Sequence, residues 1–321
     1  MPTVLYLSHA TPDVYAIIRD AAPPSVRLLT LERNDDDERK AKLREAEVVI
    51  VASHPFRAPL IDAARQLRLV HHQGVGWQDT VDHALLRERH IPLATTPEGT
   101  TTGVAEHTVL LMLACCKLLP FADRELREGR FHINALRPRS RELAGMTVGY
   151  VGFGRIGQAV AKRLRAFETR GIYHDAAVTL EAAVERDLDV RHVPLATLLR
   201  EADVVSLHVP LTPATRNLIG RDAIATMKPG AILVNTARGG IIDEDALAEA
   251  LADGRVGAAG LDVFAQEPPD PTHPLFQLAN VVVTPHISAG TRDAMTTKMR
   301  ALFANVERFF RGEPLANEVR L

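Results

Sequence analysis

The sequence has few cysteines and few aromatic residues. Of its 321 residues, two are cysteines and one is a tryptophan, and aromatic residues make up 5%. The cysteines, Cys115 and Cys116, are neighbours in an apolar stretch with a helical pattern. Neighbouring side chains on a helix point in different directions and cannot easily form a disulfide. We therefore interpret both as core thiols, in a chain that does not depend on disulfides.

The sequence also lacks a strong charge of either sign and any long hydrophobic run. Its formal net charge is −2, which favours neither nucleic acid nor an anionic membrane as a partner. The longest apolar run, residues 109–119, is interrupted by Lys117 and is too short to span a bilayer. Met1 leads into a strand-like run without the basic segment and cleavage site of a secretion signal. We expect a cytoplasmic protein without a nucleic-acid or membrane partner.

Two series of strand-like runs fill most of the chain, which is long enough for two domains. Short apolar runs alternate with helical patterns, which is typical of βαβ units and parallel sheets. The predicted strands are residues 3–8, 27–30, 48–51, 68–72 and 91–94, and then 147–153, 171–174, 204–209, 231–236, 259–264 and 281–284. Helical patterns cover residues 105–118, between the two series, and 291–311 at the end. The sequence predicts an α/β fold with two parallel-sheet domains of the Rossmann or flavodoxin type.

A glycine-rich loop follows the first strand of the second series. Gly152, Gly154 and Gly157 form the pattern Gly-x-Gly-x-x-Gly, and a predicted helix over residues 156–167 follows. In a dinucleotide site the first glycine allows a tight turn, the second lets the backbone approach a pyrophosphate, and the third lets the helix pack closely. An ordinary strand–helix turn can carry the same pattern. The strand before it and the helix after it favour dinucleotide binding.

An acidic residue, Asp175, follows the next predicted strand. A carboxylate in this place hydrogen-bonds the ribose hydroxyls of the adenosine and repels a 2′-phosphate. The residues after it are Ala176 and Ala177, so no cation follows that could bind such a phosphate. The sequence therefore favours NAD over NADP as the cofactor, although an acid that caps the loop is the alternative interpretation.

Three polar residues follow three further predicted strands, where an open parallel sheet binds its ligands. They are Arg238, Glu267 and His286. An Arg can bind a carboxylate through two hydrogen bonds, a His can donate and accept a proton, and a Glu can orient that His and favour its protonated form. Each residue alone could be a surface ion-pair partner or a loop residue. Together they predict hydride transfer between a nicotinamide cofactor and a 2-oxo acid.

With these residues the chain resembles the D-isomer-specific 2-hydroxyacid dehydrogenase family over nearly its full length. The matching blocks are residues 151–157, 208–216, 227–230, 234–239, 260–264, 267–268 and 284–287. The resemblance implies that Arg238 anchors the substrate, that His286 is the acid–base group and that Glu267 pairs with it. The cofactor-binding residues that it implies are Arg155 and Ile156 at the pyrophosphate and Asp262 at the nicotinamide carboxamide.

The resemblance also implies a domain organisation. A discontinuous substrate-binding domain, residues 1–102 and 289–321, would surround a nucleotide-binding domain of residues 103–288. Residues 104–107 resemble the connector helix of the family, which usually also forms a homodimer interface. A small 2-oxo or 2-hydroxy acid, such as glyoxylate, hydroxypyruvate or a larger 2-oxo acid, is the partner that it implies.

Two departures from the family pattern concern the first domain and a helix end. The backbone amides of Val75 and Gly76 correspond to those that bind the substrate carboxylate, but the loop of residues 74–82 has one extra residue. Glu168 occupies a helix end where the family commonly has glycine, which is an unfavourable choice for a C-cap.

Several other polar residues have weaker claims on a function. His71 and His72 are neighbours in a predicted strand, so they point to opposite faces and cannot bind one metal, and we expect no metal site. His107 is interpreted as structural. Four residues that follow strands of the first domain could influence substrate choice: His54, Phe56, Arg57 and Trp77.

Two other functions compete with reduction of a 2-oxo acid. A phosphite or formate dehydrogenase would share the fold, but formate enzymes of this group tend to have an amide in place of Glu267. An NAD-sensing scaffold, as in the corepressors of the family, would need no chemistry at Arg238, Glu267 and His286, and we expect no additional interaction module.

Overall fold

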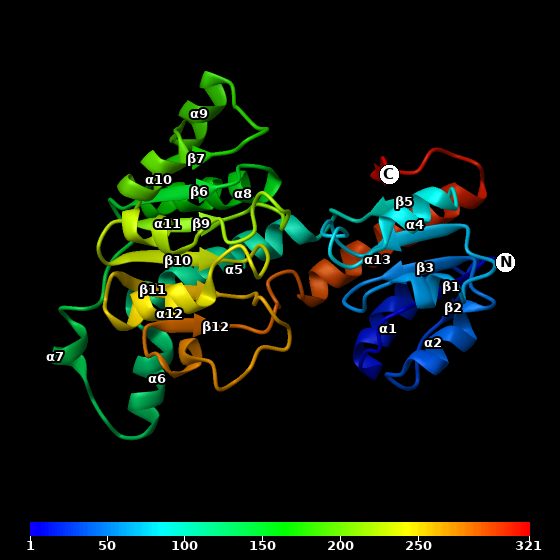
Figure 1. The fold of residues 1–321 in the computed structure, drawn as a ribbon, viewed down its shortest axis with the longest axis horizontal. Helices are drawn as coiled ribbons and strands as arrows, with labels where there is room; N and C mark the ends of the chain where they lie inside the picture. Colours follow the sequence, from blue (N-terminus) through cyan, green and yellow to red (C-terminus); the bar gives the residue numbers. More distant parts are fainter. The chain divides into compact units, whose positions relative to one another are not determined.

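The structure is a computed structural model that describes all 321 residues, and the chain divides into two compact units (Figure 1). Unit 1 consists of Met1–Thr100 and Gly290–Leu321, and unit 2 is Thr101–Ala289. Each unit contains a sheet of mostly or wholly parallel strands with helices on both faces. The predicted fold class is therefore confirmed.

Unit 1 has a six-stranded sheet in the order β13-β5-β4-β3-β1-β2, in which only β13 is antiparallel to its neighbour. The order β2-β1-β3-β4-β5 is that of the flavodoxin-like fold. Its strands are β1 (Thr3–Tyr6), β2 (Arg27–Leu29), β3 (Val48–Val51), β4 (Leu69–His72), β5 (Leu93–Thr95) and β13 (Glu318–Val319). Its helices are α1 (Pro12–Ala21), α2 (Asp36–Leu43), α3 (Ala58–Ile61), α4 (His83–Glu88) and α13 (Arg292–Phe310).

The strands of unit 1 form because their residues are apolar on both sides. All four residues of β3 are buried, as expected of a parallel strand that is covered by helices on both faces. Alternate residues enter two separate cores: Val48 and Ile50 pack with α1 and α13, whereas Val49 and Val51 pack with α2, α3 and α4. Helices α1 and α13 thus cover one face of the sheet, and helices α2, α3 and α4 cover the other.

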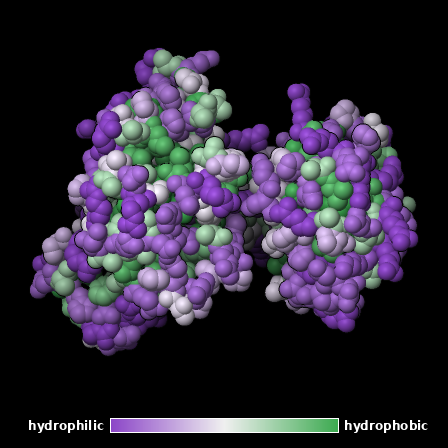
Figure 2. All heavy atoms as spheres, viewed as in Figure 1, coloured by the Kyte–Doolittle hydropathy of each residue, from purple (hydrophilic) through white to green (hydrophobic).

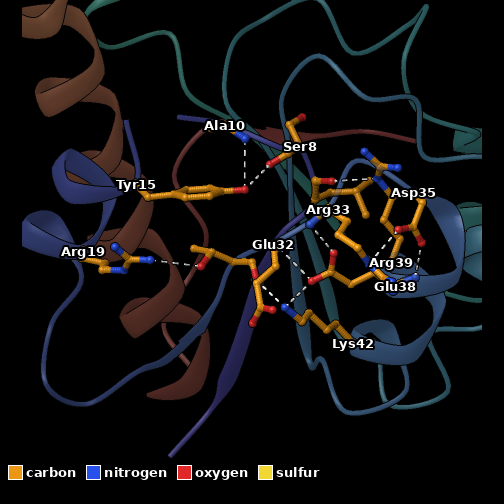
Figure 3. A network of polar contacts seen from close by, with 12 residues as sticks. Ser8, Ala10, Tyr15, Arg19, Glu32, Arg33, Asp35, Glu38, Arg39 and Lys42 are labelled. Carbon is orange, nitrogen blue, oxygen red and sulfur yellow. Dashed lines mark hydrogen bonds and ion pairs between the residues drawn. The ribbon is translucent and has the colours of Figure 1, made fainter. Parts of the chain in front are cut away.

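A polar network fixes α2 to the carboxyl end of β1 (Figure 3). The guanidinium of Arg39 is 2% exposed, and it donates to the backbone oxygen of Leu7 at 3.1 Å, to Asp36 at 3.1 Å and to Asn34. Burial of a cation is costly unless such acceptors replace its water. Next to it, Glu38 accepts from two backbone N–H groups and from Lys42. Burial alone would raise the pKa of Glu38, but these donors lower it to about 2.

Unit 2 has a seven-stranded parallel sheet in the order β12-β11-β10-β9-β6-β7-β8. Its strands are β6 (Thr147–Val151), β7 (Arg170–His174), β8 (Val190–His192), β9 (Val204–Leu207), β10 (Ala231–Asn235), β11 (Val256–Leu261) and β12 (Val281–Val283). Read along the sheet from β8 to β11, the order is the 3-2-1-4-5-6 of the Rossmann fold, and it reverses between β6 and β9.

The helices of unit 2 cover both faces of this sheet. They are α5 (Thr100–Lys117), α6 (Leu119–Arg127), α7 (Ile133–Leu136), α8 (Arg155–Leu164), α9 (Ala182–Leu188), α10 (Leu195–Glu201), α11 (Arg221–Thr226) and α12 (Glu244–Ala252), with the 3-10 turns η1 (Arg165–Phe167) and η2 (Pro274–Gln277). One core contains residues of α10, α11 and α12, and the other contains residues of α5 and α8. No single helix is long and apolar enough to cross a membrane; α5 and α6 have the length and composition only together, across a bend of 61°.

The predicted elements are present, with shifts at their ends. β11 begins at Val256, three residues before the predicted start at 259, because the glycine and alanines at its start gave no strong strand signal. Two strands were missed, β8 and β13, and both are three residues long or shorter and lie at the edge of a sheet. Short edge strands carry little hydrophobic pattern, so sequence patterns detect them poorly.

Glu168 ends the helical segment of α8 and η1 in a left-handed conformation with φ +58°. A side chain in this conformation costs roughly 1–2 kcal/mol, and glycine avoids the cost. Its side chain is exposed, and no hydrogen bond of that side chain compensates for the cost. Glu168, which stands where the family commonly has glycine, is therefore a strained residue.

We expect Glu168→Gly to raise the free energy of unfolding by about 1 kcal/mol, because the substitution removes the left-handed strain. Urea denaturation followed by circular dichroism would measure the change. Glu168→Ala is the matched control, since it removes the charge but keeps the Cβ atom. Equal stability of the two variants would contradict the explanation.

Candidate active site

The carboxyl ends of three neighbouring strands present the three residues that the sequence singled out. β10, β11 and β12 pair in parallel and lie side by side in the sheet. Arg238 follows β10, Glu267 follows β11 and His286 follows β12. Parallel strands end at the same edge of a sheet, so the three loops meet there.

Glu267 and His286 form a hydrogen-bonded ion pair, with 2.7 Å between Oε2 of the carboxylate and Nδ1 of the imidazole. The other carboxylate oxygen, Oε1, accepts from the backbone N–H of Phe264 at 3.1 Å. Burial alone would raise the pKa of Glu267, but the hydrogen bond and charge of His286, the Phe264 amide and the charge of Arg238 together lower it. The His286 side chain is 44% exposed, so its second nitrogen, Nε2, is open to a ligand.

The turn that carries Arg238 is shaped by a buried amide and a glycine. Asn235, 2% exposed, donates to the backbone oxygen of Arg238 at 2.8 Å and accepts from the N–H of Ala237 at 3.0 Å. A Cβ atom on Gly239 would lie 1.7 Å from the backbone oxygen of Phe264. Only glycine therefore allows the Arg238 turn to pack against the segment that leads to Glu267.

Asp262 is fully buried and binds the loop that carries His286. Its carboxylate accepts from the hydroxyl of Thr284 at 2.6 Å and from the backbone N–H groups of Ile287 and Ser288 at 2.9 Å each. The backbone oxygen of Asp262 accepts from the N–H of His286 at 2.8 Å. The family resemblance implies that Asp262 holds the nicotinamide; in the structure its carboxylate binds the His286 loop and lies 3.6 Å from Nε2 of His107.

The glycine-rich loop lies between β6 and α8, where the strand order of the sheet reverses. Gly152 has φ +91°, and a Cβ atom on it would lie 2.7 Å from the backbone of His208, after β9. A Cβ on Gly157 would lie 2.6 Å from the backbone oxygen of Gly152, whereas a Cβ on Gly154 would meet nothing within 4 Å. Two glycines thus allow close packing within the protein, and the third leaves open space in front of the helix.

The start of α8 fits a pyrophosphate. Gly154 is the N-cap of this ten-residue helix, and it has no side chain to satisfy the first N–H groups. Arg155 and Ile156 are the first two helical residues, and the side chain of Arg155 is exposed. A helix start with free N–H groups and open space in front of it is suited to an anion.

Asp175 follows β7 and contacts the glycine-rich loop. Its Oδ2 accepts from the N–H of Phe153 at 2.7 Å, and its Oδ1 accepts from Ala177 at 2.8 Å and Val178 at 2.9 Å. Burial alone would raise the pKa of Asp175, but these backbone donors and His174 lower it. Asp175 therefore holds a negative charge beside the loop at neutral pH.

The remaining predicted residues belong to unit 1. Val75, 46% exposed, and Gly76 follow β4. The rest of the 74–82 loop is held by hydrogen bonds between the backbones of Phe56 and Thr80 and of Phe56 and Asp82.

The four residues considered for substrate choice differ in their surroundings. Phe56 is fully buried in the core, so the possibility that it faces a substrate is wrong. Arg57 donates to the backbone of Asp79, and Trp77 packs against the core and His83. His54 stays partly exposed, 3.4 Å from Asp36. Arg57 is exposed and His54 and Trp77 are partly exposed, so these three, unlike Phe56, keep surface that could contact a substrate.

Sequence reasoning missed three residues that build this site. Asn235 shapes the Arg238 turn, Glu244 accepts from the N–H of Ala265 at 2.6 Å, and Thr284 binds Asp262. A polar residue that is buried at the end of a strand, such as Asn235, is the one signal that the sequence offered. No group of three or more His, Cys, Asp or Glu residues could hold a metal ion.

Comparisons with known proteins agree with this geometry. Residues 109–288 match the family model for the NAD binding domain of D-isomer specific 2-hydroxyacid dehydrogenases. The chain is 44% identical to the hydroxypyruvate reductase of Thermotoga maritima over 269 residues, which cover 83% of this chain and 85% of the relative. It is 39% identical to the D-3-phosphoglycerate dehydrogenase of Archaeoglobus fulgidus over 91% of this chain, but spans only 55% of that longer relative.

A solved structure resembles the whole chain. The TT0316 protein from Thermus thermophilus aligns with a TM-score of 0.87 and 34% identity over 100% of both chains. Matches of this extent, together with the family model, establish the relationship. The chain belongs to the D-isomer specific 2-hydroxyacid dehydrogenase family.

Proposed function

We propose that the chain reduces small 2-oxo acids to D-2-hydroxy acids with NADH, and that Arg238, Glu267 and His286 carry the reaction. The observation that supports this most strongly is the ion pair between Glu267 and His286, next to Arg238, at the sheet edge that also carries the glycine-rich loop. An acid–base group, a group that orients it and a cation for a carboxylate are what this reaction needs.

His286 supplies the proton. Because Nδ1 is held by Glu267, the nitrogen that faces the substrate is Nε2. In the direction of reduction, the protonated imidazole donates the Nε2 proton to the carbonyl oxygen; in the direction of oxidation, the neutral imidazole accepts a proton from the hydroxyl. Glu267 stays ionised through the neutral range because its pKa is lowered, so it stabilises the protonated imidazole.

Arg238 binds the carboxylate of the substrate. Its planar guanidinium can donate two parallel hydrogen bonds, which fixes the orientation of the acid and of the neighbouring carbonyl group.

The cofactor of this proposal fits the residues of unit 2. When bound, NADH supplies the hydride that adds to the carbonyl carbon. The open space at Gly154 and the free N–H groups at Arg155 and Ile156 suit the pyrophosphate. Asp262, whose side chain is buried, is proposed to hold the carboxamide side of the nicotinamide.

The test of the proposed reaction is NADH oxidation with glyoxylate, hydroxypyruvate, pyruvate and a larger 2-oxo acid. We expect at least one of them to be reduced, and His286→Ala to lower kcat about 10²–10⁴-fold, because the proton donor is lost. The matched control is His192→Ala, an exposed histidine on β8, which should keep normal activity. Absence of any reduction, or full activity of His286→Ala, would refute the proposal.

A second variant tests the pairing within this proposal. Glu267→Gln should also lower kcat, because the imidazole of His286 loses the carboxylate that orients it. The double variant should be no slower than His286→Ala alone, because residues that act as a unit are not additive. Faster oxidation of formate than reduction of any 2-oxo acid would instead favour a formate dehydrogenase.

We propose NAD rather than NADP as the cofactor, because Asp175 directly follows β7, the second strand of the Rossmann fold, and an ionised acid there repels a 2′-phosphate. The negative charges of the carboxylate and of a 2′-phosphate would repel one another, and the alanines that follow Asp175 provide no cation to offset this repulsion. The backbone donors that lower the pKa of Asp175 keep it charged at neutral pH.

Replacement of Asp175 by Ala should weaken the binding of NADH more than that of NADPH. NADH loses hydrogen bonds to its ribose hydroxyls, whereas NADPH is relieved of the repulsion. Fluorescence titration of both cofactors would give the two Kd values, and their ratio is unaffected by any common loss of folded protein. A wild-type protein that binds NADPH more tightly than NADH would contradict this interpretation.

We also propose that two copies of the chain form a homodimer through α5, α6 and the segment that follows. This part of unit 2 exposes large apolar side chains: Leu110 by 51%, Leu119 by 50%, Leu126 by 60%, Phe131 by 75% and Ile133 by 46%. Figure 2 shows hydrophobic residues among the hydrophilic surface in the region of α6. A cluster of exposed apolar residues of this kind marks an interaction site.

Leu126→Asp combined with Phe131→Asp should convert the dimer into a monomer, because each charge would have to be buried without a partner. Light scattering coupled to size exclusion would measure the mass. Val184→Asp, on the exposed side of α9, is the control and should leave the mass unchanged. A monomeric wild-type protein would overturn the proposal.

A further inference from the structure

A series of hydrogen bonds connects helix α5 to the loop that carries His286. His107 lies in α5, and its Nε2 is 2.9 Å from the hydroxyl oxygen of Thr284. The same hydroxyl lies 2.6 Å from the carboxylate of Asp262. Neither His107 nor Thr284 takes part directly in the proposed proton transfer.

The direction of these hydrogen bonds follows from the groups themselves. Asp262 accepts only, so the hydroxyl of Thr284 must donate its single proton to that carboxylate. The hydroxyl can therefore only accept from His107, which requires a proton on Nε2 of the imidazole. His107 thus acts as the donor that fixes Thr284 in the orientation in which it binds Asp262.

Asp262, the last group in this series of hydrogen bonds, binds residues on both sides of His286. Thr284 precedes His286 by two positions, and Ile287 and Ser288, which follow it, donate to the same carboxylate. His286 itself has φ +52°, and its N–H donates to the backbone oxygens of Asp262 and Thr284. A left-handed histidine is costly, so the loop keeps this shape only while these contacts persist.

A second contact of α5 reaches the same loop. A Cβ atom on Gly103 would lie 2.9 Å from the backbone oxygen of Ser288. Gly103 stands four residues before His107, on the same face of the helix. One side of α5 therefore contacts both ends of the His286 loop, at Thr284 and at Ser288.

We propose that His107 and Thr284 are positioning residues for proton transfer: through Asp262 they hold the His286 loop so that Nε2 of His286 lies where the carbonyl oxygen of the substrate binds. This proposal rests on the proposed role of His286 as the acid–base group. Its energetic basis is that an error of about 1 Å in the position of a reacting group can cost about 10²-fold in rate.

The experiment compares two pairs of variants. Thr284→Val and His107→Leu remove the hydroxyl and the donor at nearly constant volume, whereas Thr284→Ser and His107→Gln keep a hydroxyl and an N–H donor. We expect the first pair to lower kcat for reduction of the best 2-oxo acid about tenfold, with the KM of that acid and the Kd of NADH within about threefold of wild type. The second pair should recover most of the activity.

Two further measurements separate positioning from general stability. Hydrogen exchange of the Ile287 and Ser288 amides, without cofactor, should speed up in Thr284→Val and His107→Leu, while exchange in β6 stays unchanged. The double variant should be about as slow as the slower single variant, since both break the same chain of contacts. Thr226→Val, an exposed threonine at the end of α11, is the matched control and should behave as wild type.

The outcomes are distinct from those of the proposed function. If His286→Ala is inactive but Thr284→Val and His107→Leu keep the kcat of wild type, only the positioning role is refuted. If these variants weaken NADH binding and leave kcat intact, the contacts serve the cofactor and the proposal is overturned. If His286→Ala is fully active, the proposed function itself fails.

Discussion

The carboxylate of Asp262 has no exposed surface, and a buried carboxylate is tolerated only where hydrogen bonds replace its water. Three donors do so, and all three come from the five residues around His286. The need to satisfy one buried group therefore fixes the conformation of a loop that is otherwise short and exposed. The same loop then presents the imidazole of His286 to Glu267, so the ion pair depends on Asp262 although Asp262 touches neither of its side chains.

A second constraint is the close packing of backbones at the carboxyl edge of the sheet. Gly152 packs against the backbone of His208, and Gly239 packs against that of Phe264. Each contact joins loops that follow two different strands, so the edge behaves as a connected surface rather than as separate loops. The open space at Gly154 is the exception within this surface, and it lies at the start of a helix, where an anion is favoured.

Most of the fold and the main residues of the site could be predicted from the sequence, because each left a local signal. Buried parallel strands such as β3 read as continuous apolar runs, and polar residues directly after such runs, such as Arg238, stand out. The chain order of the strands also placed Glu267 and His286 at one edge, since parallel strands end together. Edge strands such as β8 gave no such signal, because one side of them has no neighbour to bury.

The contacts that orient the site could not be predicted, because they join residues far apart in the chain. His107 and Thr284 are separated by 177 positions, and nothing local distinguishes either from an ordinary helix or loop residue. Likewise, Gly239 gives no sign in the sequence of the carbonyl oxygen that its missing side chain accommodates. A sequence pattern shows which residue occupies a position, whereas the contact that requires this residue often involves another helix, strand or loop.

The left-handed backbone of His286 shows how these constraints combine. Such a conformation costs a non-glycine residue roughly 1–2 kcal/mol, and a glycine could adopt it freely but could not pair with Glu267. The site therefore requires a strained histidine, and the strain persists only because its surroundings over-determine it. The hydrogen bonds of Asp262 to both sides of His286 meet this requirement, and the pairing of Nδ1 with Glu267 then leaves one defined nitrogen free. The backbone and the side-chain orientation of this one residue are thus set by two different neighbours, Asp262 and Glu267, which is why no single stretch of sequence encodes them.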